Sequence, residues 1–174
     1  FCVAQYEDSN WVRPAAVKAD DQTIVEKGGW SQITNTGEEF SETNYRLYLA
    51  GGTLTPVIEY AHPGDVHTYV HATGATPLML HQWNYVVGVF DGNALTLYVN
   101  GYEQASVTSG VGPNVNDDPL RIGGTVLDLQ AGDIAFKEFA GRIDEVAIYD
   151  HTLTSREIHD TFVYQASWVE DRQN

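Results

Sequence analysis

The sequence predicts an all-β fold: a sandwich of two antiparallel β-sheets with one short helix near the C-terminus. Short alternating or apolar runs recur between turn residues at the spacing typical of a sandwich. Helical periodicity is nearly absent, and no strand–helix–strand alternation indicates a parallel sheet. The chain has 174 residues, 43% of them hydrophobic, which is enough for one sizeable core. We therefore expect a single domain.

The strands are expected where β-branched and aromatic residues gather, because these side chains suit a pleated, half-buried surface. The clearest runs are Tyr45–Leu49, Val57–Tyr60, Val66–Val70, Trp83–Phe90, Leu95–Val99 and Ile143–Tyr149. Residues 91–93 and 100–101 predict hairpins, since their Asp, Asn and Gly residues tolerate the positive φ of tight turns. The last strand is expected to return beside the first and so close a curved, double-layered shell.

One helix is predicted from a capping box. Thr154 is followed three residues later by Glu157, a spacing at which the two residues satisfy each other's backbone N–H groups. Ile158 and Phe162 follow at i and i+4, as in an amphipathic helix. The domain is expected to span residues 1–166, and the polar tail 167–174 is interpreted as a linker.

Charge and hydropathy exclude two classes of partner. Nine Lys and Arg residues against 24 Asp and Glu residues give a net charge of −15, so a nucleic acid backbone would be repelled. No window approaches the roughly 18 consecutive apolar residues of a membrane span. Because the chain starts with Phe and carries no signal segment, we expect it to be processed or excised from a longer chain, and to be secreted or on the cell surface. The single cysteine, Cys2, is either a buried thiol or bonded to a thiol of another chain.

Five segments, in a fixed order, carry a family resemblance. They are residues 83–92, 95–101, 119–124, 139–150 and 153–158. Together they resemble the laminin-G-like, concanavalin A-like lectin/glucanase jelly roll, whose signature pentraxins share. The resemblance implies two stacked, curved sheets in an extracellular module that binds glycans or proteins, commonly with calcium. The opening strand of the family looks missing or altered, because polar Asp8 and Asn10 stand where apolar residues are usual.

A structural calcium ion is the predicted cofactor. Asp144 lies beside core-forming Ile143, and a carboxylate near a core needs hydrogen bonds or a cation. Calcium binds several carboxylate and carbonyl oxygens. In laminarinase-type relatives the Asp that opens the similar last strand is a calcium ligand, and the resemblance implies this role for Asp144, with a carbonyl near Gly28 or Gly29 as a second ligand. The alternative is that Asp144 accepts only backbone N–H bonds.

A glycan-binding surface is predicted from strand alternation. If the aliphatic residues of the strands face the core, a polar and aromatic set faces away. That set comprises Arg46, Tyr48, Glu59, His67, Tyr69, His71 and Tyr98. Aromatic rings pack on the apolar faces of sugars, and the polar side chains bind hydroxyl groups. The alternative is that Tyr and His are simply good strand formers. Trp11 and Trp83 are expected to pack at the sheet edges.

Catalysis is not expected. A retaining glycosidase needs two carboxyl groups about 5–5.5 Å apart, and no strand carries such a pair at alternate positions. Lyase signatures are also absent. Two alternatives to a glycan-binding or adhesion module remain. One is a protein-interaction or self-assembly module of a cell-surface or filament protein, in which the missing strand leaves an N-terminal edge for another chain. The other is a polysaccharide lyase or hydrolase.

Overall fold

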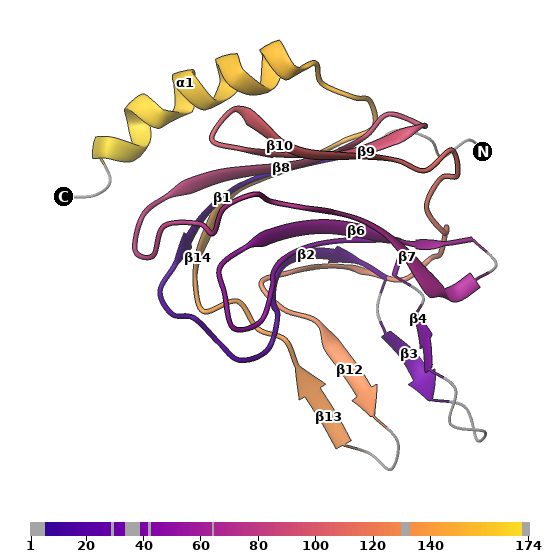
Figure 1. The fold of residues 1–174 in the computed structure, drawn as a ribbon. Helices are drawn as coiled ribbons and strands as arrows, with labels where there is room; N and C mark the ends of the chain where they lie inside the picture. Colours follow the sequence, from indigo (N-terminus) through magenta and orange to yellow (C-terminus); the bar gives the residue numbers. More distant parts are fainter. Residues whose placement is uncertain are drawn as a thin grey trace.

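The computed structural model describes residues 6–28, 30–33, 39–41, 43–63, 65–129 and 133–171, and it has the predicted two-sheet antiparallel sandwich (Figure 1). The first five-stranded sheet has the order β10-β9-β8-β1-β14. Its strands are β1 (Tyr6–Pro14), β8 (Asn84–Phe90), β9 (Ala94–Val99), β10 (Tyr102–Thr108) and β14 (Gly141–Tyr149). The second has the order β11-β2-β5-β6-β7. Its strands are β2 (Gln22–Lys27), β5 (Tyr45–Leu49), β6 (Pro56–His62), β7 (Asp65–Thr73) and β11 (Leu120–Ile122).

A third, four-stranded sheet was not predicted. It has the order β13-β12-β3-β4 and lies below the second sheet in Figure 1. Its strands are β3 (Trp30–Ile33), β4 (Glu39–Ser41), β12 (Val126–Leu129) and β13 (Asp133–Phe136). Because each has only three or four residues, none leaves the periodic pattern by which a strand is recognised in a sequence.

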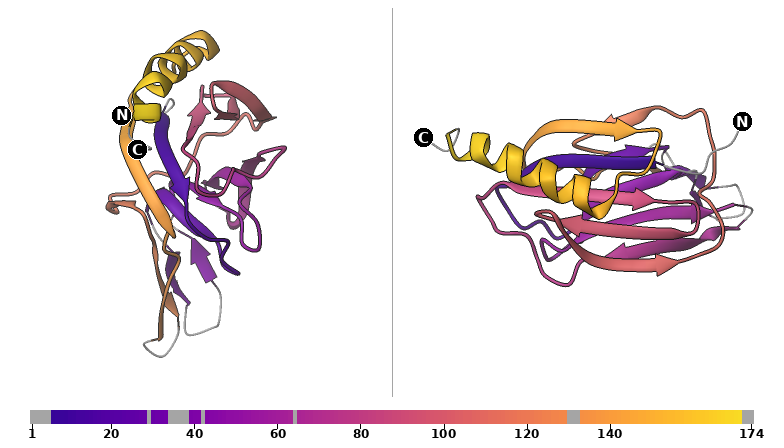
Figure 2. Two further views of the ribbon diagram at one scale, coloured as in Figure 1. Left: turned by 90° about the vertical axis from the view of Figure 1, so that its left-hand side faces the viewer. Right: turned by 90° about the horizontal axis from the view of Figure 1, so that it is seen from above.

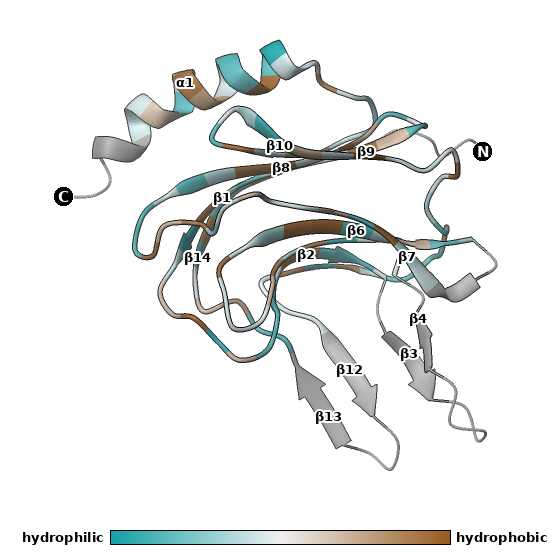
Figure 3. Ribbon diagram, viewed as in Figure 1, coloured by the Kyte–Doolittle hydropathy of each residue, from teal (hydrophilic) through white to brown (hydrophobic). Residues whose placement is uncertain are grey.

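The main core lies between the two large sheets. Aliphatic residues from both sheets meet there, and Figure 3 shows the apolar stretches along β6 and β8. The two sheets lie close together where Gly88 of β8 faces Ile58 of β6. A Cβ atom at Gly88 would lie only 2.8 Å from Ile58 Cδ1. Glycine therefore stands in the middle of a predicted strand because the opposite sheet leaves no space for a side chain.

The return of the last strand to the first is confirmed. β14 pairs antiparallel with β1, and β8 pairs with the other edge of β1. The expected open N-terminal edge is therefore not β1, which has a neighbour on both sides. Asn10 of β1 is fully buried, and its amide has no hydrogen-bond partner among the described residues. Cys2 lies outside the described residues.

The helix α1 (Ser155–Asp171) starts where the capping box predicts. The Thr154 N–H donates to Glu157 Oε2 at 2.7 Å, and the Glu157 N–H donates to Thr154 Oγ1 at 3.2 Å. However, α1 has 17 residues and continues into the segment interpreted as a linker. It lies over the outer face of the first sheet (Figure 2), where Ile158 and Phe162 join a second apolar cluster with Trp11 and Tyr85. No helix in the described part of the chain is long and apolar enough to cross a membrane.

Candidate functional site

Three of the predicted glycan-binding residues, Arg46, Glu59 and His71, form part of a row of ionisable side chains on the outer face of the second sheet. Cross-strand register aligns one residue from each of its five strands. The row runs Arg121, Glu26, Arg46, Glu59 and His71. Opposite charges directly across an antiparallel ladder attract, so the pair Arg46 and Glu59 stabilises the register of β5 and β6.

Arg46 is the centre of this row and is not available to a ligand. Its side chain is 3% exposed, its Nη2 lies 3.0 Å from Glu59 Oε1, and the same nitrogen lies 3.2 Å from Asp21 Oδ2. The guanidinium also stacks 3.7 Å from the centroid of the Tyr48 ring. The Tyr48 hydroxyl donates to Glu59 Oε2 at 3.0 Å. Arg46 Nε also donates to Glu59 Oε1 at 3.1 Å, whereas Arg46 Nη1 is buried without a hydrogen-bond partner among the described residues.

Burial shifts the pKa values of several ionisable side chains around Arg46. It raises the pKa of Tyr48, and the negative charge of Glu59 raises it further. Burial also raises the pKa of Glu26, more than its hydrogen bonds and the charge of Arg46 lower it. For Asp21 burial alone would raise the pKa, but the Gly51 N–H bond and the charges of Arg46 and Lys137 outweigh it, so the pKa is lowered. This pattern is typical of a structural ion-pair network.

The remaining predicted platform residues do not share one site. His71 is exposed and Tyr69 is half-buried, both on the edge strand β7. The side chain of His67 lies outside the described residues. Tyr98 is on the first sheet, where it packs with Trp11 and Ile158. Tyr98 therefore lies on a different sheet from Tyr69 and His71, so the predicted residues do not form one platform.

The two described residues of the predicted calcium site lie on different sheets. Asp144 is on β14 of the first sheet, opposite Trp11, and its Oδ1 accepts the Glu145 N–H at 2.9 Å. Gly28 follows β2 of the second sheet, and its carbonyl accepts a hydrogen bond from Arg121. Gly29 lies outside the described residues. The two oxygens predicted as ligands thus each accept a hydrogen bond within the chain, and no group of three potential metal ligands occurs among the described His, Cys, Asp and Glu residues.

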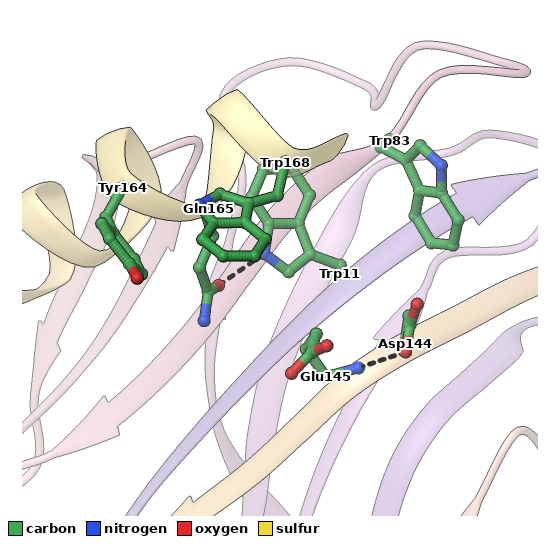
Figure 4. A pocket seen from close by; sticks show the side chains of 7 residues that line it. All are labelled: Trp11, Trp83, Asp144, Glu145, Tyr164, Gln165 and Trp168. Atoms are coloured by element: carbon green, nitrogen blue, oxygen red, sulfur yellow. Dashed lines mark hydrogen bonds between the residues drawn. The ribbon is translucent and has the colours of Figure 1, made fainter. Parts of the chain in front are cut away.

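A pocket of about 250 Å³ lies instead between α1 and the outer face of the first sheet (Figure 4). We call it the helix pocket. Its lining residues are Trp11, Trp83, Asp144, Glu145, Tyr164, Gln165 and Trp168. The strands supply the carboxylates and the helix supplies Tyr164, Gln165 and Trp168. Aromatic rings thus surround a space that also has carboxylate and amide groups, the usual composition of a small-ligand site.

A β-bulge places two successive carboxylates at the helix pocket. In a regular strand, neighbouring side chains point to opposite faces. Here the register of β1 and β14 shifts between Ser9 and Trp11, and Glu145 has a φ of 51°. Consequently Asp144 and Glu145 both line the pocket. Bulges and left-handed non-glycine residues are concentrated at functional sites, which makes this segment a candidate on geometry alone.

A side-chain hydrogen bond connects the helix wall of the pocket to the sheet. Trp11 Nε1 donates to Gln165 Oε1 at 2.6 Å, and Figure 4 shows the Gln165 amide nitrogen pointing away from Trp11. The Trp11 ring stacks on Phe162 at 5.9 Å between centroids. Further along the helix, the ring centroids of Tyr164 and Trp168 lie 5.8 Å apart, and these side chains are 66% and 58% exposed. The pocket is therefore held in place by buried contacts but keeps aromatic surface for a ligand.

Sequence reasoning missed this pocket. Trp11 and Trp83 were expected to pack at sheet edges, with a ligand role as the less favoured alternative, and Trp168 was placed in the linker. The signal that could have found the helix wall is the i, i+4 pair Tyr164 and Trp168, which continues the helix beyond Phe162. No sequence pattern indicated that a bulge would bring Glu145 to the same side as Asp144.

The chain matches a laminin-G-type family described as the concanavalin A-like lectin/glucanases superfamily over residues 9–159. Among curated proteins, a mannan endo-1,4-beta-mannosidase from Cryptopygus antarcticus is 30% identical over 84 residues, which is 45% of this chain and 21% of that enzyme. The chain thus spans about a fifth of the enzyme's length.

Three solved structures have a similar fold. The CBM40 of the Ruminococcus gnavus IT-sialidase, bound to α2,3 sialyllactose, has a TM-score of 0.71 at 16% identity over 92% of this chain and 83% of that one. Domain 4 of AbnA, an extracellular arabinanase of Geobacillus stearothermophilus in complex with arabinotriose, has a TM-score of 0.60 at 21% identity, over 90% and 66%. The heptameric SAP-like pentraxin of Limulus polyphemus has a TM-score of 0.61 at 15% identity, over 90% and 69%. At these identities the likeness is one of fold.

Proposed function

This chain belongs to the concanavalin A-like lectin/glucanase superfamily, and from that premise we propose that it is an extracellular glycan-binding module whose ligand lies in the helix pocket. The observation that carries the proposal is the lining: three Trp and one Tyr around Asp144, Glu145 and Gln165. Sugar rings have apolar faces that pack on aromatic rings, and hydroxyl groups that bond to carboxylates and amides. The same fold occurs in proteins of different functions, so the function has to be inferred from the residues of the site.

Two similar folds support the ligand class. The structures with sialyllactose and with arabinotriose show that this sandwich is used by carbohydrate-binding domains in other proteins. The exposure of Trp168 and Tyr164 supports the location, because a large ring that is only partly covered keeps a face for stacking. By contrast, Arg46 and Glu59 of the predicted platform are already bonded to each other.

The proposal is tested with a glycan array, followed by affinity electrophoresis in gels that contain the polysaccharide identified on the array. Trp168→Ala and Trp83→Ala are each expected to abolish retardation without changing the unfolding midpoint by more than a few degrees. Tyr102→Ala is the matched control, because Tyr102 is also 62% exposed but lies on β10, outside the pocket lining. The double variant Tyr69→Ala, His71→Ala examines the other sheet. Loss of binding in that variant, with binding intact in the Trp168 variant, would move the site to β7.

The proposal is for binding without hydrolysis. The matched segment covers only 21% of the mannosidase, so the match does not extend that enzyme's activity to this chain. Incubation with the polysaccharide that binds, followed by measurement of reducing ends and of ultraviolet-absorbing unsaturated products, separates binding from hydrolase or lyase activity. Release of product that disappears in Asp144→Asn or Glu145→Gln would show that the pocket is catalytic instead.

We also retain the calcium ion as a proposal, although Asp144 Oδ1 and the Gly28 carbonyl each already accept a hydrogen bond within the chain. If calcium binds, chelation lowers the unfolding temperature of the parent protein. Because Asp144 Oδ1 already accepts the Glu145 N–H, Asp144→Asn is expected to show the same decrease on chelation. A decrease that vanishes in Asp144→Asn would make Asp144 a ligand, whereas an unchanged parent temperature would remove calcium from the proposal.

A further inference from the structure

We infer that Gln165 selects the ligand of the helix pocket through an amide that the Trp11 indole holds in one orientation, and that this ligand is an uncharged N-acetylated sugar, such as the N-acetylglucosamine units of chitin. The inference rests on the proposed function and deepens it by naming the ligand class. Three features support it: the direction of the Gln165 amide, the aromatic ring beside that amide, and the net charge of the chain.

The Gln165 amide has one orientation that suits its partner. An indole N–H donates a hydrogen bond and cannot accept one, whereas an amide has an oxygen that accepts and a nitrogen that donates. Trp11 Nε1 donates to Gln165 Oε1 at 2.6 Å. A reversed amide would place two donors against each other and leave a nearly buried indole N–H without an acceptor, since Trp11 is 3% exposed. The hydrogen bond from Trp11 therefore determines where the amide nitrogen lies.

The amide nitrogen is thereby presented to the pocket as a donor. Gln165 lines the pocket, and Figure 4 shows its Nε2 on the side of the amide away from Trp11. Gln165 has no hydrogen bond with the described residues other than the one from Trp11. A ligand group that meets Nε2 has to accept a hydrogen bond. A carbonyl oxygen only accepts, whereas a hydroxyl group can donate or accept.

An exposed aromatic ring lies beside this donor. Trp168 is three residues after Gln165 on α1, and residues at i and i+3 are neighbours on a helix surface. Trp168 also lines the pocket. An acetamido group has a carbonyl oxygen and a methyl group on the same carbon, so it can accept from Gln165 while its methyl group packs on the Trp168 ring. A hydroxyl group can make only the first of these contacts.

The net charge of the chain favours an uncharged ligand. A net charge of −15 repels saccharides that carry carboxylates or sulfates. Sialylated glycans have both an acetamido group and a carboxylate, so they offer the group that Gln165 binds but are opposed by the charge of the chain. We therefore expect uncharged N-acetylated sugars to bind more tightly than sialylated ones.

The test uses isothermal titration calorimetry with α2,3-sialyllactose and with β-1,4-linked oligomers of equal length, built from N-acetylglucosamine or from glucose. We expect the N-acetylglucosamine oligomer to bind more tightly than sialyllactose, and about tenfold more tightly than the glucose oligomer, equivalent to about 1.4 kcal/mol. Gln165→Glu keeps an oxygen for the Trp11 indole but replaces the donor with a second oxygen. A hydroxyl group can reverse its hydrogen bond toward that oxygen and a carbonyl cannot, so the ratio of the two oligomer affinities should fall to about one.

Two further variants separate the amide orientation from other effects. Ser167→Glu adds the same negative charge at an exposed position of α1 outside the pocket lining, and it should keep the tenfold ratio. Trp11→Phe removes the N–H that orients the amide but retains a ring beside Phe162, and it should lower the ratio. Because the ratio compares two ligands of one variant, a loss of stability that weakens both equally does not change it.

The outcomes separate this inference from the proposed function. Equal affinity of the parent for the two oligomers, a tenfold ratio that persists in Gln165→Glu, or an equal fall of the ratio in Gln165→Glu and Ser167→Glu overturns the inference and leaves glycan binding in place. The same follows if sialyllactose binds more tightly than the N-acetylglucosamine oligomer, or if the array shows only saccharides without an acetamido group. If the glycan array shows no bound saccharide of any kind, the proposed function itself fails.

Discussion

Trp11 and Gln165 are 154 residues apart in sequence, and a 2.6 Å hydrogen bond from the indole Nε1 to the amide Oε1 joins them. Trp11 is on β1 and is 3% exposed, while Gln165 is on the half of α1 that sequence reasoning placed at the domain boundary. This bond therefore connects the beginning of the fold to its end, at the wall of the helix pocket.

Gln165→Ala is predicted to destabilise the protein by about 1–3 kcal/mol, because it leaves a nearly buried indole N–H without its acceptor. Urea denaturation measures the change. Ser167→Ala is the control on the same helix, since the Ser167 hydroxyl bonds only locally to the Tyr164 carbonyl at 2.8 Å. Equal stability of Gln165→Ala and the parent would mean that the helix is not fixed to the sheet through this bond.

Arg46→Met is predicted to destabilise the fold by about 3–5 kcal/mol, because it leaves the buried Glu59 carboxylate without its cation. Arg46→Lys should recover little, since a lysine cannot reproduce the forked donors and the stacking on Tyr48. Arg156→Met is the matched control, because Arg156 is 89% exposed and pairs with Asp160 only on the surface of α1. A fully stable Arg46→Met that has lost glycan binding would assign Arg46 to the ligand.

Glu26 is predicted to make stability fall as pH rises. Its folded pKa lies above the ordinary value of 4.5 because of burial, so its contribution is fully present below that pH and is lost as pH rises through the raised pKa. The unfolding free energy of the parent minus that of Glu26→Gln should decrease over this range. Asp21, whose pKa is lowered from 3.8, has the opposite sign, and its stabilisation is lost as pH falls through its lowered pKa. A constant difference between parent and Glu26→Gln would contradict the burial argument.

Gly88→Ala is predicted to destabilise the sandwich by about 1–3 kcal/mol through overpacking, because the new Cβ would lie 2.8 Å from both Cγ1 and Cδ1 of Ile58. The double variant Gly88→Ala, Ile58→Ala should lose less stability than the sum of the losses of the two single variants. Gly112→Ala is the control, since a Cβ there meets only Phe90 at an ordinary 3.7 Å. Additive losses at Gly88 and Ile58 would show that the two sheets can separate to make space.

The sequence by itself determined the sandwich, the main strands, the hairpins and the start of the helix. Each depends on local signals: the alternation that predicts Tyr45–Leu49 as a strand, the turn at Asn100, and the exchange of hydrogen bonds between Thr154 and Glu157. These signals act within a few residues, so they can be recognised without any contact distant in sequence. The end of the helix was missed because the polar residues after Ser167 were interpreted as a linker, although Trp168 pairs with Tyr164 at i, i+4.

Only the tertiary structure decided which outward side chains remain available to a ligand. Alternation placed Arg46 and Glu59 on an outer face, but strand register brought them together with Asp21 and buried them. Conversely, a bulge on β14 and the docking of α1 assembled a pocket from residues as distant as Trp11 and Trp168. The physical reason is that periodicity determines the direction of a side chain, whereas its exposure depends on what the rest of the chain packs against it.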